Sequence, residues 1–575
     1  MVLLAVCAIA AKFYAAERLD ELGDGHVLGA GNEWAQMAHR HLYEAVQAPS
    51  TDMIMTAVLL HEHALRIGNY AAAFVITGLA VRLAQALRLN LEQQNTRGNS
   101  DAPPCAYESC RRLMWSVYIM DAWVGSGVDE LTLLSDKNIK IELPVSEMDF
   151  VLENTKMPTG NPTSEEETRN LDLEAHFATL VGLRQRVLWY ILLTMRMWER
   201  IIKNLDSTQE PWLAQSEWSV IREELLRWNH GLPVNLGLTR SSIQKRKISG
   251  QHGALLHLHL TYHQTFYDLT RIGMPGLMRI KTPVVFPPEQ GDFVRGLQDQ
   301  CFEHGLAVSS IFDEALRHGM EAFADTWLCV VAHDVSRMLI HFLVNKFGSG
   351  FLRDEASMAR EVEAAVRANA SALDRMIHIM ALARPLLEAV IADLEMNGLE
   401  VPPDLAQKFH RADVRRRGSA VQLPSSSSQS NWGAGTLSQQ GPENVLAPLA
   451  IFRMARKDIA ENRVHGRPED MSNPARLDKS PNETEVAAAT AAQQPPFTWM
   501  QLTSQRPLTT SHTADAQSEC MASPIEFNQL PMGFDDLQVY MTAPLMMDGY
   551  LERTMHGSTM DGGNSFATAH WPGWS

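Results

Sequence analysis

The sequence predicts an all-α fold, an irregular multi-helix bundle or solenoid-like array, with a long disordered C-terminal tail. Apolar residues recur at helical spacing over most of the first ~400 residues, whereas strand-like alternation is nearly absent. Hydrophobic residues make up 45% of the chain, an ordinary share for a globular protein. Past Arg417 the chain becomes rich in Ser, Gln, Gly, Pro and Ala, a composition that cannot bury enough apolar surface to fold.

The length of the chain favours more than one structural part, because 575 residues exceed what one hydrophobic core usually holds. We expect a core domain over residues 1–150, a helical continuation over 151–412 and the tail over 413–575. The formal net charge of −17 argues against broad electrostatic attraction to nucleic acid, which needs clustered lysines and arginines.

Cysteines and apolar runs limit the class of protein further. The six cysteines are scattered without a Cys-x-x-Cys pair, so the sequence indicates neither a disulfide framework nor a zinc cluster. The apolar opening MVLLAVCAIAAKF has no basic stretch before it, which favours a core helix over a secretory signal. We expect no membrane-spanning segment, because no run reaches ~18 uninterrupted apolar residues.

The first expected helices cover about 2–22, 32–47, 51–67 and 70–90, joined by short polar links. The last of these is apolar on most sides, and Gly78 lies within it. A glycine inside a helix costs ~1 kcal/mol relative to alanine, so we expect Gly78 to permit a close helix contact. The glycines at 23, 25, 29 and 31 lie between helices and predict a flexible loop, since a dinucleotide-binding loop would follow a strand.

Later elements follow the same helical spacing. A polar loop at 95–104 precedes a central helix, an extended run covers 138–143, and a second polar loop covers 154–168. Helices are then expected at about 171–205, 215–229, 250–271, 289–318, 321–347 and 354–396. The short basic runs at 245–247 and 411–417 are either nuclear-import signals or solvated loop charges.

The central helix begins near Glu108 and is apolar nearly all round, so it must lie inside other helices. Its few charges therefore need partners, because an unpaired buried charge costs several kcal/mol. Arg111 and Arg112 stand three and four positions after Glu108, within side-chain reach on a helix. Asp121, two turns further on, is placed to tie the helix to a neighbour.

The order of these residues resembles a known family. The pattern Glu-x-x-Arg-Arg-x-x-Trp-x-x-Tyr-x-x-Asp, followed by a glycine, an aspartate and a run ending in Leu-Pro, resembles the middle homology region of fungal-specific transcription factors. The helix at 70–90 is similar to that family's Gly-x-Ala-x-Arg helix. The family's usual Gly-Arg-Pro is replaced here by Gly127-Val128-Asp129-Glu130. The residues that carry the resemblance are Gly78, Arg82, Glu108, Arg111, Arg112, Trp115, Tyr118, Asp121, Asp136 and Pro144.

From the residues alone, Arg111, Arg112 and Trp115 are interpreted as buried ion-pair and packing residues that identify a scaffold. The resemblance implies the regulatory and activation part of a fungal RNA polymerase II transcription factor in the nucleus. It implies promoter-DNA binding through a zinc-dependent module that the given chain lacks, so zinc is expected only in that module. A homodimer and a small-molecule effector are further partners that the resemblance suggests.

The segment 524–552 lies in the predicted tail and interleaves Phe, Leu, Met and Tyr with Asp and Glu. This composition is typical of an activation segment that docks on the transcription machinery, although an inert tail has the same appearance.

Two other functions stay open at the level of sequence. One is a ligand-binding or dimerising regulator that has lost DNA binding and sequesters related factors. The other is an all-α enzyme, but the chain has no His-Glu-x-x-His, Gly-x-Ser-x-Gly or P-loop motif. His259 and His263 are four apart on one helical face without a third ligand, which favours core or rim residues over a metal site. We therefore assign no catalytic, metal-binding or DNA-binding residue and no cofactor.

Overall fold

The computed structural model describes residues 1–19, 27–91, 104–152, 171–203, 207–277, 284–348, 354–403 and 451–465. Within these ranges the chain is helical, and the prediction of an all-α fold is confirmed. The extended run predicted at 138–143 contributes an isolated parallel bridge, in which Lys140 pairs with Leu91. The predicted activation segment at 524–552 and the basic run at 411–417 lie outside the described residues.

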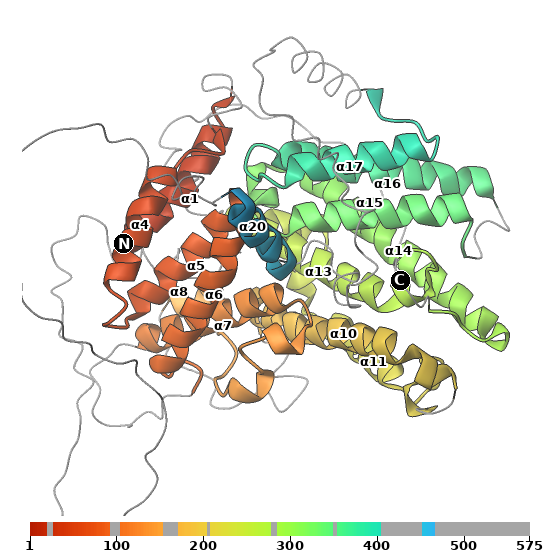
Figure 1. Cartoon of the computed structure of the whole chain (residues 1–575), viewed down its shortest axis with the longest axis horizontal. Helices are drawn as coiled ribbons and strands as arrows, with labels where there is room; N and C mark the ends of the chain where they lie inside the picture. Colours follow the sequence, from red (N-terminus) through yellow and green to blue (C-terminus); the bar gives the residue numbers. More distant parts are fainter. Residues whose placement is uncertain are drawn as a thin grey trace, which may run out of the picture.

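The N-terminal helices form one end of the molecule (Figure 1). Helix α1 packs against α4 and α5, α5 packs against α6, and α6 packs against α7. The side chain of Asn69 begins α6 by accepting a hydrogen bond from the backbone N–H of Ala72, as an N-cap residue does. The bounds of these helices are Val2–Ala16 (α1), Asn32–Glu44 (α4), Thr51–Arg66 (α5), Tyr70–Ala86 (α6), Pro104–Gly125 (α7) and Glu147–Val151 (α8).

The later helices continue this array and close with a three-helix group, α15, α16 and α17. Their bounds are Leu173–Ile202 (α10), Glu217–His230 (α11), Arg240–Ile248 (α12), His252–Thr270 (α13), Gly291–Ala315 (α14), Leu328–Asn345 (α15), Glu355–Met376 (α16) and Ala383–Met396 (α17). Short 3-10 turns occupy Asp129–Leu131, Asp136–Asn138, Ser207–Gln209, Val234–Leu236, Arg271–Gly273, Pro288–Gln290 and Met320–Phe323.

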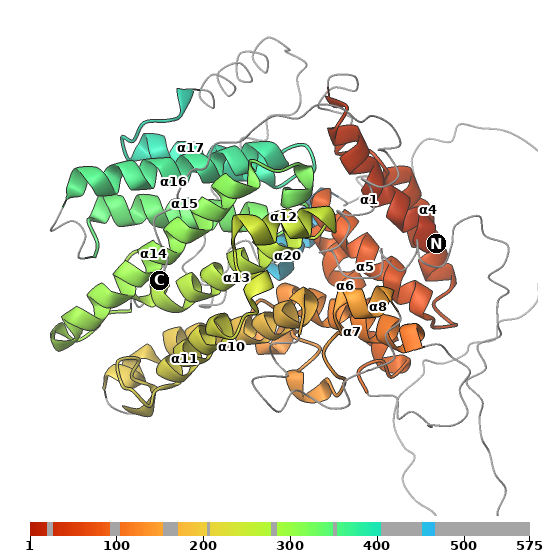
Figure 2. The ribbon, with the colours of Figure 1, turned by 180° about the vertical axis from the view of Figure 1, so that it is seen from behind.

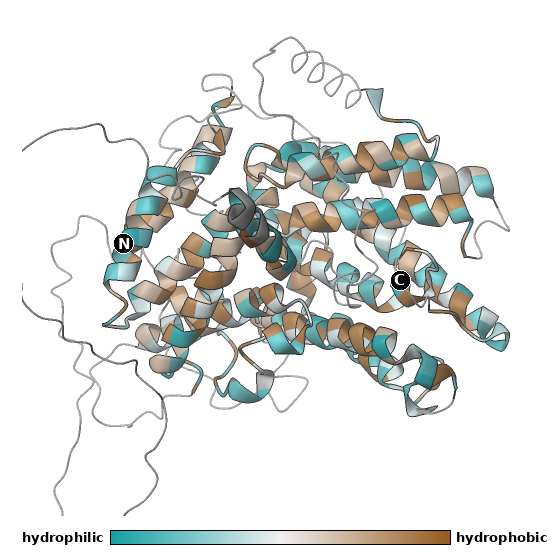
Figure 3. Cartoon of the chain, viewed as in Figure 1, coloured by the Kyte–Doolittle hydropathy of each residue, from teal (hydrophilic) through white to brown (hydrophobic). Residues whose placement is uncertain are grey.

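Helix α13 is the centre of the array. It packs against α10, α11, α12 and α14, and every residue in it except His263 is buried. Figure 2 shows α12 and α13 between the N-terminal helices and the α14–α17 group. One apolar cluster runs from Ala5 in α1 to Leu394 in α17. It crosses the boundary predicted near residue 150, so both predicted parts share a core. Figure 3 shows the expected amphipathic pattern, with hydrophobic and hydrophilic residues along the same helices.

Among the described residues, only α15 is long and apolar enough to cross a membrane by length and composition. It packs against α14, α16 and α17, and 67% of it is buried inside the fold. These contacts are those of a core helix.

The helix predicted over 354–396 is two helices, because α16 ends at Met376 and α17 begins at Ala383. Pro385 lies in the first turn of α17. A proline is tolerated there but would break the backbone hydrogen bonding of a continuous helix. The segment between the two helices contacts α5, because the backbone N–H of Ala381 donates to the carbonyl of Arg66 at the end of α5, at 2.9 Å.

The prediction of a basic loop at 245–247 is wrong, because these residues belong to α12. Thr239 caps the helix by accepting a hydrogen bond from the N–H of Ser242. Arg246 is buried and forms an ion pair with Asp172 at the start of α10. One of the three basic side chains is therefore structural.

The described part of the tail departs from the prediction, because Ile451–His465 forms a helix, α20. It packs on α6 and α7 (Figure 1), and Phe452 and Met454 join the main apolar cluster. An amphipathic segment inside a low-complexity stretch gives a weak helical signal by itself, and this helix depends on tertiary packing.

Two glycines show where backbone geometry constrains the fold. Gly31 caps α4 with φ +81°, and a Cβ atom there would lie 2.2 Å from the carbonyl oxygen of Ala8 in α1. Gly31 thus allows the close contact between α1 and α4. At Gly78, by contrast, an added Cβ would meet Leu133 at 3.9 Å, an ordinary contact, so the predicted close helix approach is not found there.

These two positions make a matched pair of substitutions. Gly31→Ala should lower the free energy of unfolding by about 2 kcal/mol, because it combines a positive φ with a steric clash. Gly78→Ala should raise it by ~0.5–1 kcal/mol, because alanine is the better residue inside a helix. Urea denaturation followed by circular dichroism measures both. Equal effects at the two sites would contradict the proposed packing of α1 on α4.

Candidate functional site

The residues of the family-like motif lie on α7 and on the segment after it. Helix α7 starts with Pro104, which is favoured at the first helical position because its missing N–H is not needed there. It packs against α5, α6, α10 and α20, so it is enclosed as its apolar sequence predicts.

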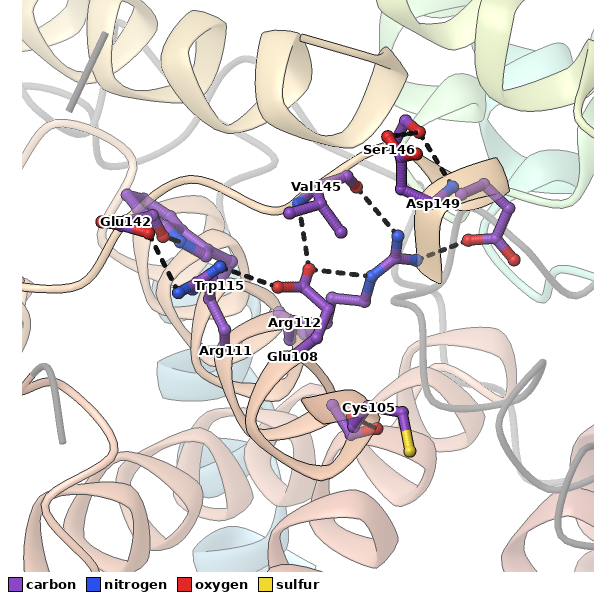
Figure 4. A network of polar contacts seen from close by, with 12 residues as sticks. Cys105, Glu108, Arg111, Arg112, Trp115, Glu142, Val145, Ser146 and Asp149 are labelled. Atoms are coloured by element: carbon purple, nitrogen blue, oxygen red, sulfur yellow. Dashed lines mark hydrogen bonds and ion pairs between the residues drawn. The ribbon is translucent and has the colours of Figure 1, made fainter. Parts of the chain in front are cut away.

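The carboxylate of Glu108 is the centre of a buried network (Figure 4). Its Oε2 atom accepts a hydrogen bond from Nη1 of Arg111 at 2.9 Å, and its Oε1 atom accepts one from Nε of Arg112 at 3.2 Å. Oε1 also accepts the backbone N–H of Val145 at 3.0 Å. Glu108 is 1% exposed, so one carboxylate holds two guanidiniums and a backbone donor away from water.

Both guanidiniums extend the network to the segment after α7. Arg111 donates to Glu142 at 3.1 Å, and Arg112 donates to Glu147 at 2.5 Å. Arg112 also donates to the carbonyl of Val145 at 2.9 Å. The two arginines therefore connect the helix to residues 142–147 through side chains and backbone together.

Aromatic rings cover this network. The indole Nε1 of Trp115 donates to the carbonyl of Glu142 at 2.8 Å, and its ring meets Tyr118 edge-on at 5.3 Å. The guanidinium of Arg112 lies 4.3 Å from the centre of the Phe150 ring, within the range of a cation–π contact. Trp115 is half-buried and Tyr118 is buried.

Asp121 fixes the path of the chain beyond the helix. Its Oδ2 atom accepts the backbone N–H groups of Leu133 and Leu134, both at 2.8 Å. Burial raises the pKa of Asp121 to about 6, and the two backbone donors oppose this rise because they favour the charged form.

The divergent turn at 127–130 packs on α10. Gly127 has φ +80°, and a Cβ there would lie 2.4 Å from the Cβ of Leu188. The backbone N–H of Gly127 donates to Gln185, whose amide in turn donates to the carbonyl of Ala122. Only glycine fits this close approach. This explains why the turn begins with a glycine, as the family's Gly-Arg-Pro does, although the residues after it differ.

Within the described part of the chain, Gly78, Arg82 and Pro144 form no hydrogen bond or ion pair with this network. Arg82 is exposed on α6 and bonds Gln85 of its own helix, and Gly78 faces Leu133. Pro144 is buried beside Val145. Asp136 starts a 3-10 turn, and its side chain lies outside the described part of the chain.

A second buried carboxylate near Arg112 was missed by the sequence interpretation. The carboxylate oxygens of Glu174, in the first turn of α10, are buried, and this burial raises the pKa of Glu174 to about 7 while the charge of Arg112 opposes the rise. Burial would lower the pKa of Arg112, but Glu174, Glu147 and Glu108 together raise it. Arg112 is thus surrounded by carboxyl groups from three elements. Glu142, Glu147 and Glu174 are distant from Arg112 in sequence, so local spacing could not reveal them.

A further cluster, also missed, joins α7 to the later helices. Trp123 contacts Trp327 at 5.1 Å between ring centres, and the guanidinium of Arg184 lies 5.1 Å from the Trp123 ring. Arg184 forms a buried ion pair with Asp268 of α13 at 2.8 Å, and Arg271 pairs with the same carboxylate at 3.2 Å. Again one carboxylate holds two guanidiniums.

Within the described ranges, no group of three or more His, Cys, Asp or Glu residues could hold a metal ion. His263 does not share a ligand site with His259. Its Nδ1 atom lies 2.8 Å from Nδ1 of His304 on α14, whereas His259 bonds the carbonyl of Leu236. The site as a whole consists of buried ion pairs under aromatic cover, which suits a structural connection between elements.

Comparisons with known proteins identify the region that contains this network. Residues 1–186 match the model of the fungal specific transcription factor domain. An uncharacterized transcriptional regulatory protein of Schizosaccharomyces pombe is 26% identical over 292 residues, which is 47% of this chain and 28% of that protein. The Zn(2)-C6 fungal-type transcription factor FTF1c of Fusarium oxysporum f. sp. lycopersici is 23% identical over 337 residues, 56% of this chain and 34% of that protein.

The chain thus spans about a third of the length of the curated relatives it matches. No solved structure matches it. The matched region ends within α10, after the motif helix and the segment bound to it, so it includes all ten motif residues. Residues 1–186 are therefore similar to the fungal specific transcription factor domain, the family that the motif helix resembles.

Proposed function

We propose that this chain is the regulatory part of a fungal RNA polymerase II transcription factor that acts in the nucleus. The observation that supports this proposal is the match of residues 1–186, which contain the buried motif network, to a domain of transcription factors. Promoter-DNA binding would come from a zinc-dependent module of a longer protein, as the name of the Fusarium relative suggests. The family is one of transcription factors, and we propose no catalytic activity.

In this proposal the motif residues are architectural. Glu108, Arg111 and Arg112 hold the 142–147 segment on α7 and so give the regulatory domain one fixed shape. Removing one partner of a buried ion pair typically costs 3–5 kcal/mol, because the remaining charge is left without compensation in a low-dielectric interior. A rigid domain of this kind can pass the effect of a bound partner from one element to another.

Glu108→Gln tests this role directly. We expect it to lower the free energy of unfolding by about 3 kcal/mol, because two buried guanidiniums lose their shared carboxylate. Glu130→Gln removes an exposed carboxylate from the same region and should change stability by less than about 0.5 kcal/mol. Chemical denaturation measures both variants. A Glu108→Gln protein as stable as Glu130→Gln would show that the network is dispensable.

Glu174→Gln tests the electrostatics of the site through pH. The folded protein holds the Glu174 proton up to a pKa of about 7, whereas the unfolded chain releases it near the ordinary value of 4.5. This group therefore stabilises the fold at low pH, and its contribution is lost as the pH rises from about 4.5 to about 7. Glutamine stays neutral throughout.

Between pH 5.5 and 8.5, the wild-type protein should lose about 2 kcal/mol of stability relative to Glu174→Gln. Other titrating groups are common to both proteins and cancel in the difference. Urea unfolding at the two pH values gives the comparison. A difference between the proteins that does not change with pH would refute the assigned environment of Glu174.

Transcriptional activity is tested by fusing all 575 residues to a heterologous DNA-binding domain in a yeast reporter strain. We expect reporter expression to rise several-fold and to fall when residues 524–552 are deleted, because their mixed hydrophobic and acidic composition suits docking on the transcription machinery. Deletion of 470–498, a tail segment of equal length, is the control. An inert fusion would remove the proposal that this chain activates transcription.

DNA binding by the chain itself is tested by a gel-shift assay on fungal promoter fragments. We expect no zinc-dependent specific complex, because the net charge is −17 and the sequence contains no Cys-x-x-Cys pair. Added zinc and a chelator form the two arms of the assay. A specific complex that the chelator removes would show that the chain carries its own DNA-binding site.

A further inference from the structure

Helix α20 lies across the domain that residues 1–186 form, although it comes from the distant C-terminal part of the sequence (Figures 1 and 2). Most of its contacts are with α6 and α7. Four apolar residues at its start are buried to at least 94%: Ile451, Phe452, Met454 and Ala455. The helix therefore docks through one compact apolar face.

The receiving surface is made by three helices of the domain. Ile451 packs in a small cluster with Ala64 of α5, Ala73 of α6 and Val124 of α7. The two alanines have short side chains, which leaves room for an inserted side chain between the helices. Leu65, Ala72 and Phe74 pack around the same cluster. We call this surface of α5, α6 and α7 the tail groove.

A polar contact fixes the position of α20 in the tail groove. The Oδ2 atom of Asp458 accepts the backbone N–H of Tyr70 at 2.9 Å and that of Ala71 at 3.2 Å, both in the first turn of α6. The side-chain oxygen of Asn69 accepts a hydrogen bond from the next N–H group, that of Ala72. The first N–H groups of a helix have no partner within the helix and carry partial positive charge, so a carboxylate is the favoured ligand.

The opposite face of α20 is polar or open to solvent. Arg456 and Lys457 are exposed, and Ile459 is 39% exposed. The described contacts of α20 thus combine a short apolar insertion with one charged cap. This is the pattern by which amphipathic helices bind grooves on other proteins, with apolar anchors on one face.

We propose that the tail groove is a helix-binding site and that α20 is its built-in, releasable occupant. The site selects a helix with the pattern Ile-Phe-x-Met-Ala-x-x-Asp, in which the isoleucine enters the tail groove, the phenylalanine and methionine join the main apolar cluster beside it, and the aspartate caps α6. Docking of α20 tethers the C-terminal part of the chain to the domain. This inference goes beyond the proposed function and stands or falls without it.

The test uses the full chain and a labelled peptide of residues 451–465. In the Phe452→Asp chain the resident helix is disabled, so the peptide should bind at least about tenfold more tightly than to the wild-type chain, where α20 competes. A peptide that itself carries Phe452→Asp should bind at least about tenfold more weakly than the unchanged peptide. Fluorescence anisotropy measures the binding.

Hydrogen exchange of the same chains gives an independent measurement. The amides of Tyr70 and Ala71 should exchange at least about tenfold faster in Phe452→Asp, because they lose the Asp458 carboxylate. Ile459→Asp places the same new charge on the outward face of α20 and should leave these amides protected. Equal exchange in both variants, or a peptide that binds neither chain, would overturn the proposal.

Asp458→Ala provides the milder second variant if Phe452→Asp lowers the helical content of the whole chain. It keeps the apolar anchors and removes only the cap. The α6 amides should then exchange faster, and a peptide carrying Asp458→Ala should bind more weakly than the unchanged peptide. Unchanged exchange and unchanged peptide binding in this variant would also overturn the proposal.

Discussion

The structure of the matched domain depends on the buried carboxylate of Glu108. A helix that is apolar nearly all round gains from burial, but its two arginines would make burial very unfavourable without compensation. Glu108 neutralises part of this charge, and Glu142 and Glu147 supply the rest. The segment after α7 must therefore fold back over the helix, so the ion pairs determine the path of the chain as well as its stability.

A second arrangement of the same kind connects the domain to the helices beyond it. Asp268 on α13 holds Arg184 and Arg271, and Arg184 lies at the very end of the region that matches the family model. Together with the contact between Trp123 and Trp327, this ion pair crosses from the matched region to later elements. The continuous apolar cluster agrees with this view. A cut near residue 186 would expose charged and apolar groups that are now buried.

The sequence predicted the ion pairs between residues on helix α7, but it could not predict those between segments far apart in the sequence. The pairing of Glu108 with Arg111 and Arg112 follows from helical spacing alone, and so do the positions of most helices. The contact of Glu174 with Arg112 and the ion pair of Asp268 with Arg184 could not be assigned, because these partners are brought close only by packing. Gly78 shows the converse error: the local rule for glycines in helices predicted a close contact that the neighbouring element does not make.

Helix α20 was missed for the same physical reason. Local composition places it in a stretch that cannot fold alone, and its stability comes from a surface that other helices build. An aspartate carboxylate caps consecutive backbone N–H groups at two places in the domain. Asp121 accepts two consecutive backbone N–H groups and so fixes the turn after α7, and Asp458 accepts two consecutive N–H groups and so completes the start of α6. The first carboxylate lies inside the family motif, and the second comes from far along the chain. Because the unpaired backbone N–H groups at a helix start or turn can donate to any well-placed carboxylate, a segment distant in the sequence can bind to the domain without any change in the motif itself.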